Sequence, residues 1–91
     1  MKYTEEQFEQ WVQEVFDEES SRCRLVSASS YRYEATFKVR SVRGRSTAWD
    51  VRITFNSENA DCTLRATYSQ QSSIPTILAR QLQIRINESL R

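Results

Sequence analysis

The stretch of sequence that decides the fold runs from Tyr31 to Phe55 and reads YRYEATFKVRSVRGRSTAWDVRITF. Hydrophobic and polar side chains alternate through its first part, and the same alternation returns in its last part. A period of two residues is typical of a β-strand that buries one of its faces. We therefore predict two strands, over residues about 31–41 and 46–56.

Gly44, the only glycine of the chain, lies between these strands. A three-residue loop over residues 42–44 places it where the backbone must be left-handed, a conformation that glycine adopts without steric cost. In the register that follows, inward side chains meet inward side chains, so the aromatic residues point into the core and the arginines point to solvent. The predicted pairs are Tyr31 with Phe55, Tyr33 with Ile53, Ala35 with Val51, Phe37 with Trp49 and, on the outer face, Glu34 with Arg52.

A helix precedes the strands, over residues about 4–19. Thr4 and Gln7 have the spacing of a capping box, which satisfies two otherwise unpaired backbone N–H groups. Apolar residues then recur every three or four positions and form one face of an amphipathic helix. This face consists of Phe8, Trp11, Val12, Val15 and Phe16.

A second helix is predicted at the carboxyl end, over residues about 74–90. Ser73 is placed to cap it, and Pro75 is tolerated in its first turn because the missing N–H has no partner there. Its inward side chains are Ile74, Leu78, Ala79, Leu82 and Ile86.

A third strand is predicted over residues about 62–69, and residues 20–30 are interpreted as a polar connection. The element order is then α-β-β-β-α within one compact domain over residues 1–91. This order predicts an α+β fold in which two helices pack on one face of a three-stranded antiparallel meander. The other face of such a sheet is exposed to solvent.

The formal net charge of +1 conceals an uneven distribution. Residues 1–21 contain seven acidic residues and one lysine, whereas residues 22–91 contain twelve basic residues and five acidic ones. Such a division is typical of an interaction surface, but it also arises when an acidic helix lies on a mildly basic body. Both interpretations remain open at this point.

The composition offers little material for catalysis. The chain has no histidine, its two cysteines lie 39 positions apart, and one glycine cannot build a phosphate-binding loop. Cys23 lies beside Arg22 and Arg24, which favours either an ordinary loop cysteine or a mildly reactive thiol that an enzyme could use. We expect a protein without catalytic activity, cofactor or metal. Because no stretch is apolar enough to cross a membrane, we also expect a cytoplasmic location.

Three residues of the last predicted helix are candidates for partner binding: Ile77, Arg80 and Ile84. The two isoleucines lie seven residues apart on the side opposite the inward stripe. Contact with another protein or with a second copy of the chain would explain them. One prediction is therefore a homodimer formed through the last helices. The alternative is that both touch the edge of the core.

The hairpin supplies the second set of candidates, which are Arg40, Arg43, Arg45 and Arg52. Arginine suits phosphate contacts with nucleic acid, and it is also enriched in protein interfaces. A solvated loop is the third interpretation. Because the aromatic residues are predicted to point inward, they supply no stacking platform on the arginine face.

The predicted element order is similar to that of the double-stranded RNA-binding domain family across nearly the whole chain. That family carries lysines at the start of its last helix, whereas the corresponding segment here, SSIPTILARQLQ (residues 72–83), has none. The family's usual loop motif is also missing from RSVRGRS (residues 40–46). The resemblance is therefore one of topology, which does not by itself carry a function.

These observations predict a small, non-catalytic, intracellular protein-interaction module of the adaptor or inhibitor type. It would bind a larger protein or associate with itself. The alternative function is nucleic-acid binding through the arginine-rich hairpin. Phosphate binding weakens steeply with salt, whereas a dimer held by apolar contacts survives it.

Overall fold

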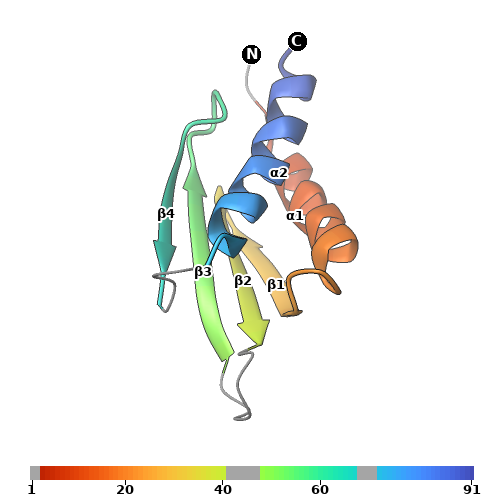
Figure 1. The fold of residues 1–91 in the computed structure, drawn as a ribbon. Helices are drawn as coiled ribbons and strands as arrows, with labels where there is room; N and C mark the ends of the chain where they lie inside the picture. Colours follow the sequence, from red (N-terminus) through yellow and green to blue (C-terminus); the bar gives the residue numbers. More distant parts are fainter. Residues whose placement is uncertain (1–2, 41–47, 68–71) are drawn as a thin grey trace.

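The structure, a computed structural model, describes residues 3–40, 48–67 and 72–91. Both helices lie on one face of a four-stranded antiparallel sheet with strand order β1-β2-β3-β4 (Figure 1). The predicted α+β class is confirmed, but the prediction of three strands is wrong. The elements are α1 (Glu5–Glu19), β1 (Leu25–Tyr31), β2 (Glu34–Arg40), β3 (Ala48–Phe55), β4 (Cys62–Ala66) and α2 (Ile74–Ser89).

The additional strand is β1, which occupies most of the segment interpreted as a polar connection. Its sequence, LVSASSY, contains three serines and lacks a clear alternation of apolar residues. An irregularity between Leu25 and Ser27 shifts the register and leaves Val26 exposed. With four strands, the similarity in element order to double-stranded RNA-binding domains does not hold.

The pairing of β2 with β3 differs from the prediction by two residues. Phe37 lies opposite Val51 rather than Trp49, and Glu34 lies opposite Thr54 rather than Arg52. A shift of two residues keeps every side chain of β2 and β3 on its predicted face, because the side-chain period of a strand is also two. The loop over residues 42–44 and Gly44 lie outside the described residues.

Tyr31 was predicted to point into the core, and this prediction is wrong. It ends β1 opposite Glu34, on the outer face, and 71% of its surface is exposed. The turn from β1 to β2 begins at Arg32, whose φ of 56° lies in the left-handed region. A side chain with a Cβ pays roughly 1–2 kcal/mol for that conformation.

The core lies between the sheet and the helices, and aromatic rings fill the end near the amino terminus. Tyr3 packs edge-on against Tyr33 with 5.4 Å between ring centroids, and Phe8 packs against Phe55 at 5.6 Å. The hydroxyl of Tyr3 donates a hydrogen bond to the carbonyl of Asn56. Burial, followed by the nearby Tyr33, raises the pKa of Tyr3 to about 12.

The capping box that positions α1 is present. The backbone N–H of Gln7 donates to Thr4 Oγ1 at 3.1 Å, and the backbone N–H of Thr4 donates to Gln7 Oε1 at 2.8 Å. At the start of α2, Ser73 makes no capping hydrogen bond, contrary to the prediction. Instead, Ser72 Oγ accepts a hydrogen bond from the N–H of Ile74 at 3.2 Å.

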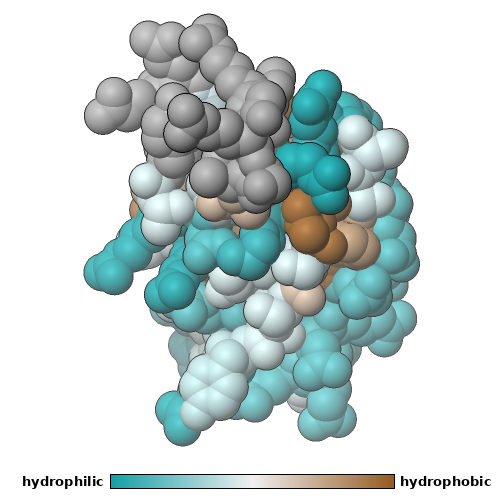
Figure 2. All heavy atoms as spheres, turned by 90° about the horizontal axis from the view of Figure 1, so that it is seen from below, coloured by the Kyte–Doolittle hydropathy of each residue, from teal (hydrophilic) through white to brown (hydrophobic). Residues whose placement is uncertain are grey.

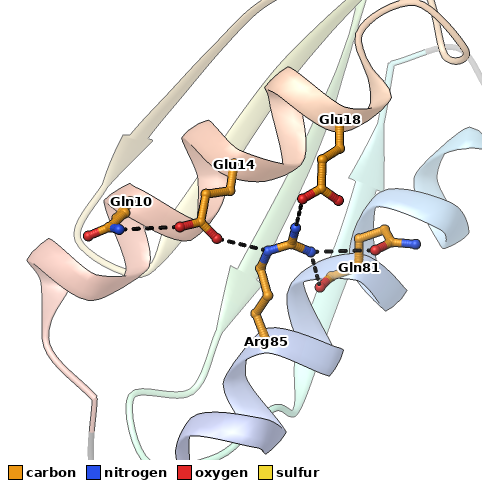
Figure 3. A network of polar contacts seen from close by, with 5 residues as sticks. All are labelled: Gln10, Glu14, Glu18, Gln81 and Arg85. Atoms are coloured by element: carbon orange, nitrogen blue, oxygen red, sulfur yellow. Dashed lines mark hydrogen bonds and ion pairs between the residues drawn. The ribbon is translucent and has the colours of Figure 1, made fainter.

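Arg85 joins the two helices (Figure 3). Its Nε–H donates to Glu14 of α1 at 3.1 Å, its Nη2 group pairs with Glu18, and its Nη1 group donates to the backbone carbonyl of Gln81 at 3.3 Å. Burial alone would lower the pKa of Arg85, but its hydrogen bonds to Glu18 and Glu14 outweigh burial and raise it. The acidic helix is therefore partly neutralised from within the molecule.

Candidate binding surface

The solvent face of the sheet carries two of the four predicted hairpin candidates, Arg40 and Arg52. Strand alternation places hydroxyl and charged side chains on this face, while the buried residues of β2 and β3 face the helices. Three of the charged side chains have partners on the same face. Lys38 pairs with Asp50 at 3.0 Å, and Thr54 Oγ1 donates to Glu34 at 3.0 Å.

Three arginines in the strands of this face have no such partner. Arg40, Arg52 and Arg65 are exposed, and among the described residues none of them forms an ion pair. Arg52 of β3 and Arg65 of β4 lie directly opposite each other in the ladder. Like charges in that position destabilise a sheet, so these two side chains are not explained by stability.

The structure brings Arg40 and Arg52 onto one surface, as the strand alternation predicts, and adds Arg65. The sequence also predicts that Arg65 faces outward, but it did not identify Arg65 as a candidate, because this residue lies on the following strand rather than in the hairpin. The other two hairpin candidates, Arg43 and Arg45, lie outside the described residues. We call the group formed by Arg40, Arg52 and Arg65 the outer arginine cluster.

Among the described residues, one aromatic side chain, that of Tyr31, shares this face with the arginines. The guanidinium carbon of Arg32 lies 5.4 Å from the ring centroid of Tyr31, within the range of a cation–π contact. Nucleic-acid binding was disfavoured because the aromatic residues were predicted to point inward. The exposed ring of Tyr31 contradicts that prediction for one of them. It does not restore a broad stacking platform, because Tyr33 and Trp49 pack against the core.

The helical candidates separate into two environments. Arg80 is exposed, and Ile84 is 44% exposed. Ile77 is partly buried and packs against the core, which agrees with the alternative left open by the sequence for this residue. The outer face of α2 therefore presents one isoleucine rather than two.

Large hydrophobic side chains are scattered over the described surface rather than gathered. Seen from below, hydrophilic residues dominate the surface and hydrophobic residues form only a small patch (Figure 2). Isolated exposed apolar residues are normal for a folded domain. Those of the described residues are Val26, Tyr31, Leu64 and Ile84.

Cys23 lies in an environment that opposes reactivity. It is buried, and its Sγ lies 3.8 Å from the carboxylate of Glu19, which is buried as well. The same carboxylate forms an ion pair with Arg22 Nε at 3.3 Å. Burial and then the carboxylate of Glu19 raise the thiol pKa, with Arg22 as a weaker opposing influence. These surroundings favour the ordinary, unreactive cysteine over a thiol activated by the neighbouring arginines.

A shallow groove separates α1 from β1 on the side away from α2. Its lining is mostly polar, and Glu9 is its only ionisable group. A single carboxylate supplies neither a nucleophile with its base nor a set of metal ligands. The lining residues are Glu9, Val12, Gln13, Ala28, Ser29 and Ser30.

Two further properties concern only residues 3–40, 48–67 and 72–91. Within them, no three histidine, cysteine or carboxylate side chains come close enough together to hold a metal ion. No helix there is long and apolar enough to cross a membrane.

Comparison of the chain with protein families, with curated proteins and with solved structures gives no match.

Proposed function

We propose that the protein is a non-catalytic protein-interaction module whose binding surface is the outer face of the sheet. The observation that carries this proposal is the opposition of Arg52 and Arg65, two exposed guanidinium groups on adjacent strands without an acidic partner among the described residues. An acidic surface on a partner would offset their repulsion.

The distribution of charge over the molecule supports this proposal. Glu5, Glu6, Glu9 and Asp17 are exposed on α1, which covers the opposite face of the sheet from the outer arginine cluster. The molecule therefore has an acidic side and a basic side in spite of its small net charge. Such a separation orients an approaching partner and accelerates its association.

Arginine is also well suited to the proposed contact. Its planar guanidinium group binds carboxylates through two parallel hydrogen bonds, and arginine is enriched in protein interfaces. The hydroxyl groups of neighbouring Thr36 and Thr63 add further donors and acceptors to the same face.

The test compares partner capture by three forms of the protein. The double variant Arg52→Glu/Arg65→Glu reverses the paired charges, whereas Arg80→Glu/Arg91→Glu makes the same change in charge on α2 and beyond its end. The proposal is supported by a partner that binds both the wild type and the second variant. In purified form, this partner should bind the first variant at least roughly tenfold more weakly. Equal loss with both variants contradicts it.

A second candidate function, nucleic-acid binding, is favoured by one specific observation. Tyr31 and Arg32 present an exposed ring and a guanidinium group on the arginine face. A base could stack on that ring while the arginines contact phosphates. Fluorescence anisotropy with short single- and double-stranded DNA and RNA, at low and near-physiological salt, tests this function. Binding that Tyr31→Ala weakens more than Tyr31→Phe would favour it over the protein partner.

A further inference from the structure

The strand β4 forms one edge of the sheet. The N–H of Thr67 donates to the carbonyl of Asp50, and the N–H of Asn56 donates to the carbonyl of Asp61, both at 3.0 Å. Since the direction of backbone groups alternates along an antiparallel strand, the odd-numbered residues between these bonds face β3. The even-numbered residues therefore direct their N–H and C=O groups to the outer edge, and they are Cys62, Leu64 and Ala66.

The strand β4 is short and carries the charge of Arg65, but it lacks three other features that usually prevent edge strands from pairing with other chains, namely a bulge, a proline and a lysine. Proteins protect edge strands with bulges, prolines or lysines. At the opposite edge, β1 contains an irregularity at Val26, whereas β4 pairs with β3 in unbroken register and has the sequence CTLRA. Leu64, on the helix-facing side of β4, remains 41% exposed. No described strand pairs with the outer edge.

The side chains along β4 specify the chemistry of an added strand. A residue opposite Leu64 would lie on the helix-facing side, where an apolar side chain could cover the exposed leucine. A residue opposite Arg65 would lie on the outer face, next to a guanidinium group that already faces Arg52. An acidic side chain there is close to two positive charges. The complementary strand thus alternates acidic and apolar residues.

We propose that β4 binds an extended segment of a partner protein with alternating acidic and apolar residues, which joins the sheet as a fifth strand. This inference rests on the proposed function and identifies the kind of partner segment involved. Backbone hydrogen bonds would supply affinity, and the alternation of side chains would supply specificity.

A second copy of the chain fits this edge less well. Antiparallel self-pairing centred on Leu64 would bring another Arg65 and another Arg52 to a surface that is already positive. Nucleic acid cannot continue the ladder, because it has no peptide N–H groups. The acidic partner segment is therefore the occupant that the charges favour.

The probe is a fluorescent, end-capped, eight-residue peptide of alternating glutamate and valine. Anisotropy measures its binding, and hydrogen exchange followed by NMR measures protection of the backbone amides of Cys62, Leu64 and Ala66. We expect slower exchange at these amides when the peptide is bound. Two N-methylated peptides serve as matched controls, one methylated at the glutamates and the other at the valines. Only one set of peptide N–H groups can face β4, so one pattern abolishes binding and the other leaves it nearly unchanged.

Arg65→Glu should weaken binding of this peptide by roughly fivefold and should allow a lysine–valine peptide to bind. Arg91→Glu, beyond the end of α2 and outside the outer face of the sheet, is the control and should change the affinity by less than about twofold. Equal effects of the two methylation patterns, or of the two arginine variants, would overturn the proposal, as would no binding. If the peptide perturbs the outer-face amides without protecting the β4 edge, strand addition is wrong while the outer surface remains a binding site.

Discussion

Arg85 of α2 and Glu14 of α1 are 71 positions apart in the chain, and the Nε–H of the arginine donates a 3.1 Å hydrogen bond to the carboxylate. The arginine side chain is only 15% exposed, so removing its charge affects a largely enclosed contact. We expect Arg85→Met, which keeps the aliphatic volume, to lower the free energy of unfolding by about 1–2 kcal/mol. Urea unfolding measures this change.

Glu14→Gln and the corresponding double variant complete a mutant cycle for this contact. If Arg85 and Glu14 interact directly, the two single effects sum to more than the effect of the double variant. Strict additivity would show that Arg85 stabilises the helices through Glu18 or through packing alone.

The opposition of Arg52 and Arg65 predicts an unusual gain in stability. Arg65→Thr removes one of two like charges and introduces a β-branched residue that suits a strand, so the free energy of unfolding should rise by about 0.2–1 kcal/mol. The gain should shrink at 1 M salt, where the screening length is only about 3 Å. Arg80→Thr, in an exposed helix position, is the control and should bring no gain. A loss of stability in Arg65→Thr would show that Arg65 has a structural role.

The raised pKa of Tyr3, about 12, predicts a dependence of stability on alkaline pH. Because the folded protein holds the phenol proton more tightly than the unfolded chain, this contribution is complete below pH 10 or so, the ordinary tyrosine value, and is lost as the pH rises through 12. At neutral pH, Tyr3→Phe should lower stability by about 1 kcal/mol through loss of the hydrogen bond. The difference between the two proteins should narrow above pH 10 in urea titrations. A difference in stability that stays constant with pH would contradict this contribution of Tyr3.

The two cysteines should differ in their reaction with iodoacetamide. Cys62 is half-buried, whereas Cys23 is fully enclosed, and burial raises the thiol pKa of both. Since the thiolate is the reactive form, alkylation near neutral pH should be slow and should modify Cys62 before Cys23. Peptide mass spectrometry measures the order. Rapid labelling of Cys23 in the folded protein would instead support the thiol chemistry considered from the sequence.

Ile77 and Ile84 provide a test of self-association through α2. Ile84→Glu should change the free energy of unfolding by less than about 0.5 kcal/mol, because the residue is exposed, whereas Ile77→Glu should lower it by more than about 1 kcal/mol. If α2 mediates the predicted homodimer, light scattering should show a dimer for the wild type and a monomer for Ile84→Glu. A monomeric wild type at high concentration contradicts a homodimer.

The helices were readily predicted because each leaves a repeated local signal. In α1, the capping box fixes the first turn, and the periodic apolar residues identify the buried face. In α2, the same periodicity identifies Leu78, Leu82 and Ile86, all fully buried. The contact of Arg85 with α1 had no such signal, because it depends on how two distant helices are placed.

The strand β1 escaped prediction for a physical reason. Its side chains are mostly small and polar, and its irregularity interrupts the period on which strand prediction depends. Pairing with β2 and coverage by α1 stabilise it, and both are tertiary contacts that local propensity does not encode.

The outer arginine cluster was only partly accessible from the sequence. Alternation was sufficient to predict that Arg40 and Arg52 face solvent, but the opposition of Arg52 and Arg65 depends on the register of β3 with β4. A pattern of period two determines the face of a side chain and leaves its cross-strand neighbour undetermined.

The strand order β1-β2-β3-β4 also has a kinetic consequence. Each strand pairs with its neighbour in the chain, so the sheet can assemble hairpin by hairpin with little loss of loop entropy. The longest separations occur where α2 meets α1, at the contact between Arg85 and Glu14. We therefore expect the docking of the last helix to be the slow step of folding.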